Sequence, residues 1–293
     1  MSRIRLLFNP NSGRARAEGI TPERIYQEFR RHGIVDIAEL QMEGVDGVPH
    51  AVAEIEPDTL LVIAGGDGTI YEAVQSPVCR EMRVAIIPVG TANNLATSAG
   101  IPQEIHHAVD VAVHGEEKRI DLGMANNRIF TQAAGVGFHA RAFHLYGKRK
   151  DRSIVDASRA FLGAVSSWQP HELKIAIDGD IHEYKAFQVT VANTPVYGRE
   201  IWIAPDAMID DGLLDLVIVT GCFPRRELMR CIVNLTEGRG LDMSKVIRVT
   251  AKRIEITPQS AADIPVHADA EPIGFAPVTI EVLPSCLMLM VPR

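Results

Sequence analysis

A short glycine-rich segment, Gly65–Thr69, carries the residues in this chain best suited to chemistry. It reads Gly-Gly-Asp-Gly-Thr and follows an apolar, β-branched run at Thr59–Ala64 that predicts a buried strand. Glycines let backbone N–H groups approach a ligand closely, and a helix predicted to open at Thr69 would add partial positive charge. These features favour a phosphate group. Asp67 would repel phosphate unless a cation lay between them, so the segment predicts a nucleotide together with Mg²⁺.

A purely structural interpretation of Gly65–Thr69 stays open. Glycine-rich turns between a strand and a helix also serve as tight connections, and Gly-Gly and Asp-Gly pairs are ordinary turn chemistry. No Gly-Lys-Ser/Thr follows the segment, so it is not a Walker A motif, and it is not the Gly-x-Gly-x-x-Gly dinucleotide fingerprint. The common P-loop and dehydrogenase folds are therefore disfavoured.

Strand and helix patterns alternate in the first part of the chain. Four strands are predicted there: Ile4–Phe8, Val35–Leu40, Thr59–Ala64 and Arg83–Pro88. Such alternation predicts an α/β domain whose parallel sheet is covered by helices on both faces. Loops at residues 9–14, 65–69 and 89–94 leave the carboxyl ends of three of these strands, which is the edge where open α/β sheets bind ligands.

After about residue 122 the pattern changes to apolar alternation with a period of two. It occurs in five runs: Lys174–Ile177, Phe187–Ala192, Leu214–Val219, Arg253–Ile256 and Val278–Leu283. These runs predict a mostly antiparallel second domain, a sandwich or barrel with a few helices attached. We therefore place an α/β domain over residues 1–124 and a β-rich domain over residues 125–283, with residues 284–293 returning to the first.

Bulk composition narrows the class of protein. The 46% hydrophobic and 23% charged residues are ordinary for a soluble globular chain, and no apolar run approaches the ~20 residues that span a bilayer. The N-terminus lacks a signal-peptide pattern, so we expect a cytoplasmic protein. Four scattered cysteines predict neither a zinc site nor a disulfide framework. The net charge of −7 argues against a nucleic-acid binder, so no nucleic-acid partner is expected.

Taken together, the ordered motifs resemble those of the bacterial diacylglycerol kinase and sphingosine kinase-like lipid kinases over nearly the full chain. The motifs are Asn9-Pro10-Asn11-Ser12-Gly13, Gly65-Gly66-Asp67-Gly68-Thr69, Pro88-Val89-Gly90-Thr91-Ala92-Asn93, Ala134-Gly135-Val136-Gly137-Phe138, Ala204-Pro205-Asp206-Ala207, Asp211-Gly212-Leu213-Leu214-Asp215 and Asp269-Ala270-Glu271-Pro272. The glycine loop alone would also suit NAD kinases and phosphofructokinase-like enzymes. The later motifs point more specifically to lipid kinases. The resemblance implies a nucleotide-binding first domain and a lipid-binding β-sandwich second domain.

The resemblance also implies roles for individual residues. ATP would contact Asn9, Asn11, Ser12, Gly13, Gly65, Gly66, Asp67, Gly68, Thr69 and Thr91. Asp67 and Asp121 would hold the catalytic Mg²⁺, directly or through water. Glu271 would be the general base that accepts the proton of a lipid hydroxyl as it attacks the γ-phosphate. From the residues alone, Asp121 could equally cap a strand end, and Asp269 with Glu271 could form an exposed acidic turn.

A second, structural Mg²⁺ site is implied near residue 211. The carboxylate of Asp211 and the main-chain carbonyls of Met208 and Leu213 would bind the ion. The alternative is a simple turn with Gly212 in the left-handed region.

Four positions depart from the family pattern. Asn94 stands where many members have Asp, Ala270 replaces a Gly, and His139 replaces a common Asp. A nucleotide-contacting Thr near the end of the second strand is absent, since residues 39–41 are Glu, Leu and Gln. These departures leave Asp67 and Glu271 in place.

A basic segment predicts how such a protein would reach a lipid. Residues 141–152 concentrate cations beside apolar side chains, with Lys148, Arg149 and Lys150 at their centre. Basic groups near an anionic surface contribute about 1 kcal/mol each, so we expect peripheral association with the inner face of the membrane. The alternative is a solvated helix end.

The sequence therefore predicts a cytoplasmic ATP- and Mg²⁺-dependent kinase that phosphorylates the hydroxyl of a membrane lipid, with diacylglycerol giving phosphatidic acid as the leading case. Two alternatives stay open, namely a kinase of a soluble acceptor such as NAD and a non-catalytic nucleotide- or lipid-binding relative. Whether the chain acts as a monomer or a homodimer is left open as well.

Overall fold

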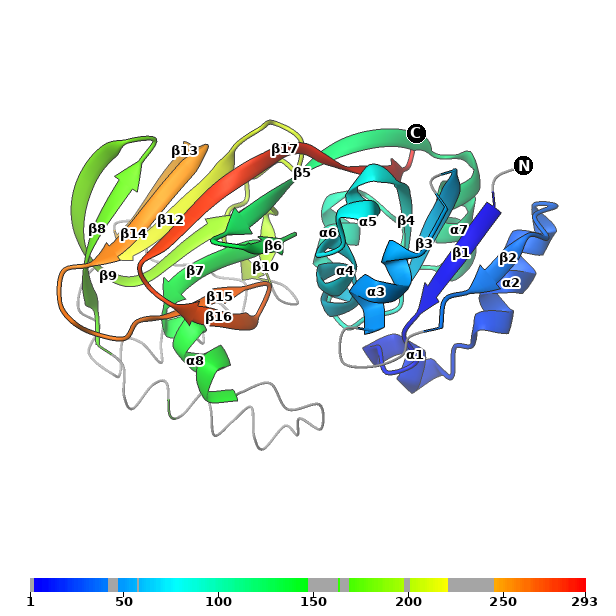
Figure 1. Ribbon diagram of the computed structural model, residues 1–293, viewed down its shortest axis with the longest axis horizontal. Helices are drawn as coiled ribbons and strands as arrows, with labels where there is room; N and C mark the ends of the chain where they lie inside the picture. The colour runs from blue at the N-terminus through cyan, green and yellow to red at the C-terminus, as the bar shows by residue number, and fades with distance from the viewer. Residues whose placement is uncertain are drawn as a thin grey trace. The chain divides into compact units, whose positions relative to one another are not determined.

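The computed structural model describes residues 3–41, 47–56, 58–146, 163, 169–197, 201–220 and 245–293. The chain divides into two compact units (Figure 1). Unit 1 comprises Met1–Leu122, Ile209–Asp211 and Pro284–Arg293, and unit 2 comprises Gly123–Met208 and Gly212–Leu283. The basic residues Lys148, Arg149 and Lys150 lie outside the described residues.

Unit 1 is built on a parallel sheet, as the alternating pattern predicted. Its strands are β1 (Arg3–Phe8), β2 (Ile37–Glu39), β3 (Thr59–Gly65), β4 (Arg83–Pro88) and the end of β17 (Val278–Val291). They lie in the order β2-β1-β3-β4-β17, and every neighbouring pair is parallel. All seven residues of β3 are buried. A continuous apolar strand is what a sheet covered on both faces requires.

Seven helices of unit 1 flank these strands in the described part of the chain (Figure 1). They are α1 (Gly13–Glu18), α2 (Pro22–Arg31), α3 (Gly47–Ala53), α4 (Asp67–Val74), α5 (Pro77–Glu81), α6 (Asn94–Ser98) and α7 (Ile105–His114).

The start of α4 corrects the sequence prediction. The helix was expected to open at Thr69, but it begins at Asp67 with Gly66 as its N-cap. The backbone N–H of Thr69 already bonds the carbonyl of Gly66 at 3.0 Å, so Thr69 lies inside the first turn. An acidic residue at the first helical position is stabilised by the positive end of the helix dipole.

Unit 2 is antiparallel and sandwich-like, which confirms the predicted fold class. Its main sheet runs β16-β15-β7-β9-β8-β14-β17, with β12 pairing β9 and β13, and with the last three residues of β5 pairing β6. The bounds are β5 (Glu116–Ala125), β6 (Arg128–Phe130), β7 (Ala133–Gly137), β8 (His171–Ile177), β9 (Asp180–Ala192), β12 (Leu214–Thr220), β13 (Val246–Ala251), β14 (Arg253–Pro258), β15 (Pro265–Ala268) and β16 (Glu271–Phe275). A separate pair joins β10 (Val196–Tyr197) to β11 (Ile201–Trp202), and α8 spans Phe138–Tyr146.

The hairpin between β15 and β16 has a strained turn. Ala268 pairs with Glu271, so Asp269 and Ala270 form a two-residue loop. Their φ angles are 46° and 68°, and positive φ at both central residues is what a type I′ turn requires. Glycine adopts this backbone conformation without a steric penalty, whereas the Cβ of Ala270 makes it unfavourable.

No helix among the described residues is both long and apolar enough to cross a membrane.

Replacing Ala270 by glycine should raise the free energy of unfolding by about 1 kcal/mol, because a left-handed conformation costs an L residue roughly 1–2 kcal/mol. Urea unfolding of both proteins measures the change. The matched control is Ala261→Gly at an exposed position whose φ is not positive, where glycine should give no gain. An Ala270→Gly protein no more stable than the wild type would show that the turn is not strained.

Candidate functional site

Three loops of unit 1 are joined at the carboxyl ends of β1, β3 and β4, where the sequence placed the ligand edge. The side-chain amide of Asn9 donates to Oγ1 of Thr69 at 2.8 Å and links the first loop to the second. The N–H of Val89 donates to the carbonyl of Gly65 at 3.1 Å, and the N–H of Arg14 donates to the carbonyl of Val89 at 2.9 Å. Direct bonds therefore connect all three loops.

Glycines allow the second and third loops to touch through their backbones. A Cβ added to Gly66 would lie 2.9 Å from Cα of Gly90, and a Cβ on Gly90 would collide with Cα of Gly66. A Cβ on Gly13 would collide with the side chain of Thr91. Gly68, by contrast, is exposed and has open space where a Cβ would go. Close loop packing is thus the immediate reason for three of the glycines.

Asp67 lies where the second and third loops meet. Its Oδ1 accepts the N–H of Leu95 at 3.3 Å, at the start of α6. Burial raises the pKa of Asp67, while backbone N–H groups of residues 93–95 act in the opposite direction. The carboxylate therefore fixes the start of α6, in addition to the Mg²⁺ role that the sequence predicts for it.

Asn93 is a site residue whose role the sequence reasoning missed. Its φ is 55°, its Oδ1 accepts the N–H of Gly90 at 2.9 Å, and its Nδ2 donates to Oε1 of Gln103 at 2.9 Å. Asn is among the few residue types enriched in the left-handed region, so its presence in the loop could have indicated a turn there. Asn93 shapes the loop that presents Thr91, which is exposed.

The remaining nucleotide candidates lie in the first loop. Asn11 is exposed, and its N–H donates to Oδ1 of Asn9 at 3.0 Å. Ser12 is buried and serves as the N-cap position of α1, which begins at Gly13. The sequence assigned this stretch to a loop and did not predict α1.

Asp121 is nearly fully buried in β5, with 2% of its surface exposed. Its Oδ1 accepts the N–H of Ser285 at 2.7 Å, and its own N–H donates to the carbonyl of Ile209 at 2.6 Å. Lys118 of the same strand pairs with Asp210 at 2.7 Å. Asp121 thus tethers other segments of unit 1 from within β5 and does not cap a strand end, and its Mg²⁺ role stays a prediction.

In unit 2, Asp269 is buried, which contradicts the alternative of an exposed acidic turn at this residue. One oxygen accepts the N–H and the hydroxyl of Thr131, at 2.7 and 2.8 Å. The other accepts the N–H groups of Gln132 and Ala133, at 2.9 and 3.1 Å. Burial raises the pKa of Asp269 to about 6, and the four donors act in the opposite direction. The residue anchors the hairpin turn to the start of β7.

Glu271 follows the anchored turn as the first residue of β16 and is half-buried. Asp269 holds the turn before it, and this anchor fixes the backbone at Glu271. Its role as general base stays a prediction.

The predicted structural Mg²⁺ site is only partly described. Gly212 has a φ of 74°, as the turn interpretation expects. Asp211 belongs to unit 1, whereas Met208 and Leu213 belong to unit 2. Ion binding by these three residues stays a prediction.

His139, which replaces a common Asp of the family, is half-buried at the start of α8, near the buried His267. Burial lowers the pKa of His139 to about 4. Burial, with a smaller contribution from His139, lowers the pKa of His267 to about 3. The ring of Phe143 packs edge-on against that of His267, with centroids 5.2 Å apart. Both histidines are therefore neutral near pH 7, and His267 packs as part of the interior.

Two family models together match most of the chain. The diacylglycerol kinase catalytic domain matches residues 3–125. The YegS C-terminal NAD kinase beta sandwich-like domain matches residues 134–291, which is more than half of the chain. The chain belongs to the diacylglycerol kinase family. The resemblance drawn from the motifs is confirmed, and as a member of this lipid kinase family the chain is a kinase.

Curated relatives of this lipid kinase are similar over most of their length. A diacylglycerol kinase of Bacillus subtilis is 27% identical over 94% of this chain and 92% of its own. A Chromohalobacter salexigens protein named "Probable lipid kinase YegS-like" is 30% identical over 86% of this chain and 82% of its own. The crystal structure of a diacylglycerol kinase from Bacillus anthracis shares the fold, with a TM-score of 0.73 at 20% identity over 99% of this chain and 97% of that one.

Gly90→Ala should destabilise the lipid kinase by about 1–3 kcal/mol, because the added methyl group overpacks the contact with Gly66. Gly68→Ala is the matched control in the neighbouring loop. It should stabilise the protein by roughly 0.5–1 kcal/mol, since alanine is the better helix former and its side chain meets open space. Chemical unfolding checks both changes, and equal effects of the two substitutions would contradict the loop contact.

Asp269 should make stability depend on pH. An unfolded carboxyl titrates near its ordinary pKa of about 4, below the folded pKa of about 6. The folded state therefore binds more protons between these values, and the free energy of unfolding should fall as the pH rises from 4 to 6, by roughly 3 kcal/mol at most. The comparison is wild type against Asp269→Asn, which cannot titrate. If the wild type instead gained stability relative to Asp269→Asn as the pH rises, the four donors would outweigh burial.

Proposed function

We propose that this lipid kinase transfers the γ-phosphate of ATP, with Mg²⁺, to the hydroxyl of diacylglycerol and so forms phosphatidic acid. The observation that carries the proposal is the joining of three loops around Asp67 at the ligand edge of a parallel sheet. The names of its relatives support the acceptor. Phosphoryl transfer depends mainly on positioning and charge neutralisation, and such a cluster of loops is suited to both.

The nucleotide phosphates would be bound by the second loop. Gly66 leaves no side chain between the ligand edge and the positive end of α4, which favours negative charge. The side chains of Asn9 and Thr69 are already fixed on each other, so binding would not need to order them. Thr91 would reach the nucleotide from the third loop.

Asp67 and Asp121 would hold Mg²⁺, since both offer the carboxylate oxygens that this hard cation prefers. Held by these two residues, Mg²⁺ would supply the positive charge that neutralises the transferred phosphate. Asp67 suits this role because its backbone and its carboxylate are both fixed, by α4 and by the start of α6. The second ion, at Asp211 with Met208 and Leu213, would be structural.

Glu271 would act on the acceptor. Its carboxylate would accept the proton of the lipid hydroxyl while the oxygen forms a bond to the γ-phosphorus, and ADP would leave with the electrons of the broken bond. The half-buried position of Glu271, directly after the turn fixed by Asp269, supports this role.

Access to a lipid would come from the basic residues Lys148, Arg149 and Lys150. We propose that they hold a cytoplasmic protein on the anionic inner face of the membrane. Reversing these three charges should weaken binding to anionic liposomes and leave ATP binding intact.

A soluble acceptor is the second candidate. The observation that favours it is that the second domain matches a family described as NAD kinase beta sandwich-like. NAD therefore belongs among the acceptors that a first assay compares.

The deciding measurement is transfer of labelled γ-phosphate from ATP to diacylglycerol in mixed micelles, with NAD and sphingosine as parallel acceptors. Glu271→Gln and Asp67→Asn should each lower kcat by about 10²- to 10⁴-fold. Glu255→Gln is the control, because Glu255 is an exposed strand residue of unit 2 paired with Arg253.

Labelled phosphatidic acid that is lost in the two variants would support the proposal. Transfer to NAD alone would move the protein to the soluble-acceptor class. Full activity of Glu271→Gln would remove that residue from the role of base.

A further inference from the structure

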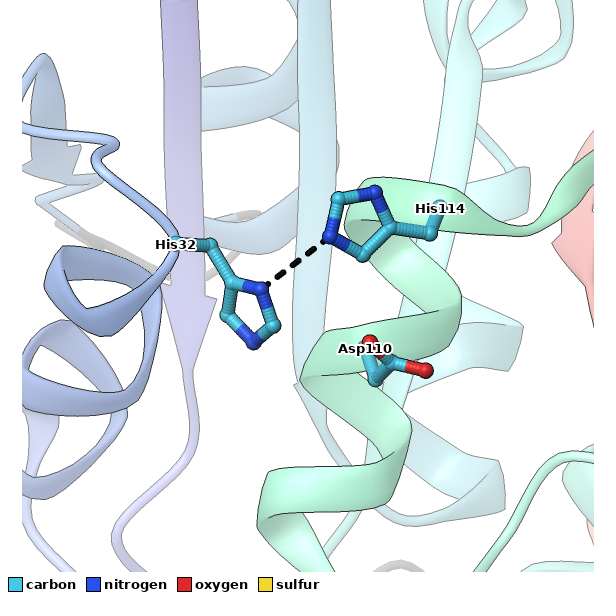
Figure 2. A group of neighbouring side chains, drawn as sticks. All are labelled: His32, Asp110 and His114. Carbon is cyan, nitrogen blue, oxygen red and sulfur yellow. Dashed lines mark hydrogen bonds between the residues drawn. The ribbon is translucent and has the colours of Figure 1, made fainter.

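Three side chains with metal-ligating atoms, those of His32, Asp110 and His114, lie together in unit 1. None of them belongs to the three loops around Asp67. Figure 2 shows Asp110 and His114 on successive turns of α7, with the ring of His32 facing that of His114 from the end of α2. Nδ1 of His32 lies 3.2 Å from Nε2 of His114. One ligand atom from each of the three residues falls within 4.8 Å of the others.

The local sequence explains why these side chains meet. Asp110 and His114 are four residues apart, and this spacing places two side chains on the same face of a helix. His32 is the residue at which α2 ends. Helices α2 and α7 pack against each other, which brings His32 to the face that carries Asp110 and His114.

We propose that His32, Asp110 and His114 bind a divalent transition-metal ion of the Zn²⁺ type. Nitrogen ligands lie about 2.0–2.1 Å from Zn²⁺, so two of them at a tetrahedral angle are about 3.3 Å apart. The two ring nitrogens share a hydrogen bond at 3.2 Å, and an ion that replaces the shared proton needs them at nearly this separation. Two imidazoles and one carboxylate are a ligand set that Zn²⁺ uses in proteins, with a fourth position left for water.

Asp110 completes the site by a local movement. The ligand-atom spacing of up to 4.8 Å is wider than a bound ion allows, but Asp110 is exposed and its side chain can rotate toward the histidines. Mg²⁺ is a poor occupant, because it prefers oxygen ligands and two of the three ligands here are nitrogens. The site therefore differs in chemistry from the Mg²⁺ sites proposed above.

Backbone electrostatics favour a cation at this place. His32 ends α2 and His114 is the last residue of α7, and the C-terminal end of a helix carries partial negative charge. Arg30 and Arg31 of the last turn of α2 oppose a cation, but Arg31 is paired with Glu28 at 2.8 Å. The carboxylate of Asp110 adds a full negative charge.

A bound ion would tie the end of α2 to the end of α7. Gly115 follows His114, and β5, which carries Asp121, begins at the next residue. The ion would therefore stabilise unit 1 where α7 passes into that strand. This role goes beyond phosphoryl transfer and does not depend on it.

The test is calorimetric titration of the chelator-treated full chain with ZnCl₂, in excess Mg²⁺ so that carboxylate sites are saturated. We expect one Zn²⁺ per chain and a higher Tm with Zn²⁺. Loss of a group that only orients a ligand costs roughly 10- to 100-fold in metal affinity, so His32→Gln and His114→Gln should each lower the affinity by about 100-fold or more. Asp110→Asn should also weaken binding.

His106→Gln and His107→Gln are the controls, because both residues are exposed on α7 outside the cluster. They should bind Zn²⁺ like the wild type. The visible spectrum of the Co²⁺-substituted protein gives a second readout, and its tetrahedral bands should disappear in His114→Gln. All variants should keep the wild-type Tm without metal, since surface substitutions change stability little.

Two results would overturn the proposal. One is a folded wild-type protein that takes up no Zn²⁺ under these conditions. The other is Zn²⁺ binding that His32→Gln and His114→Gln leave unchanged while a control variant weakens it. Kinase activity is not a readout of this test, so its result stands apart from the outcome of the phosphotransfer assay.

Discussion

The backbone contact between Gly66 and Gly90 determines the arrangement of the residues around it. Gly66 is the N-cap of α4, so the contact fixes where Asp67 begins the helix. The N–H of Gly90 is held by Asn93, whose left-handed conformation turns the chain into α6. The first N–H groups of α6 then return to the carboxylate of Asp67. A closed set of contacts thus positions Asp67. Each contact in the set depends on Gly66 and Gly90 having no Cβ atom.

Unit 2 positions its acidic residues by a different means. A fully satisfied carboxylate, that of Asp269, ties the β15–β16 turn to Thr131 and the two residues that follow it. Hydrogen bonds to charged groups contribute about 1.5–3 kcal/mol each, so four of them hold the turn firmly. Asp269 therefore works through structure, and it fixes the turn directly before Glu271, the proposed general base.

Local patterns predicted the parts of this structure that depend on local sequence. Strands β1, β3 and β4 are short, mainly apolar segments between turn residues, and their order along the chain predicted a parallel sheet with three loops at one edge. Contacts between distant residues could not be predicted in this way. Thr131 and Asp269 are 138 residues apart, and His32 and His114 are 82 apart. The burial of Asp269 depends on its contact with Thr131, and no short stretch of sequence contains both residues.

Two of the departures from the family pattern, Ala270 and Asn94, have physical consequences that leave the neighbouring carboxylates in place. Ala270 strains its turn by roughly 1–2 kcal/mol, and the four hydrogen bonds that Asp269 accepts hold the turn against this strain. The turn keeps the geometry that glycine would give it, and Glu271 keeps its place in β16. Asn94 is buried, and its backbone N–H is among those that bind Asp67. This role needs only its main chain, whereas an Asp side chain there would add a second negative charge near Asp67. The substitutions thus alter stability and local charge, and both proposed catalytic carboxylates keep their supports.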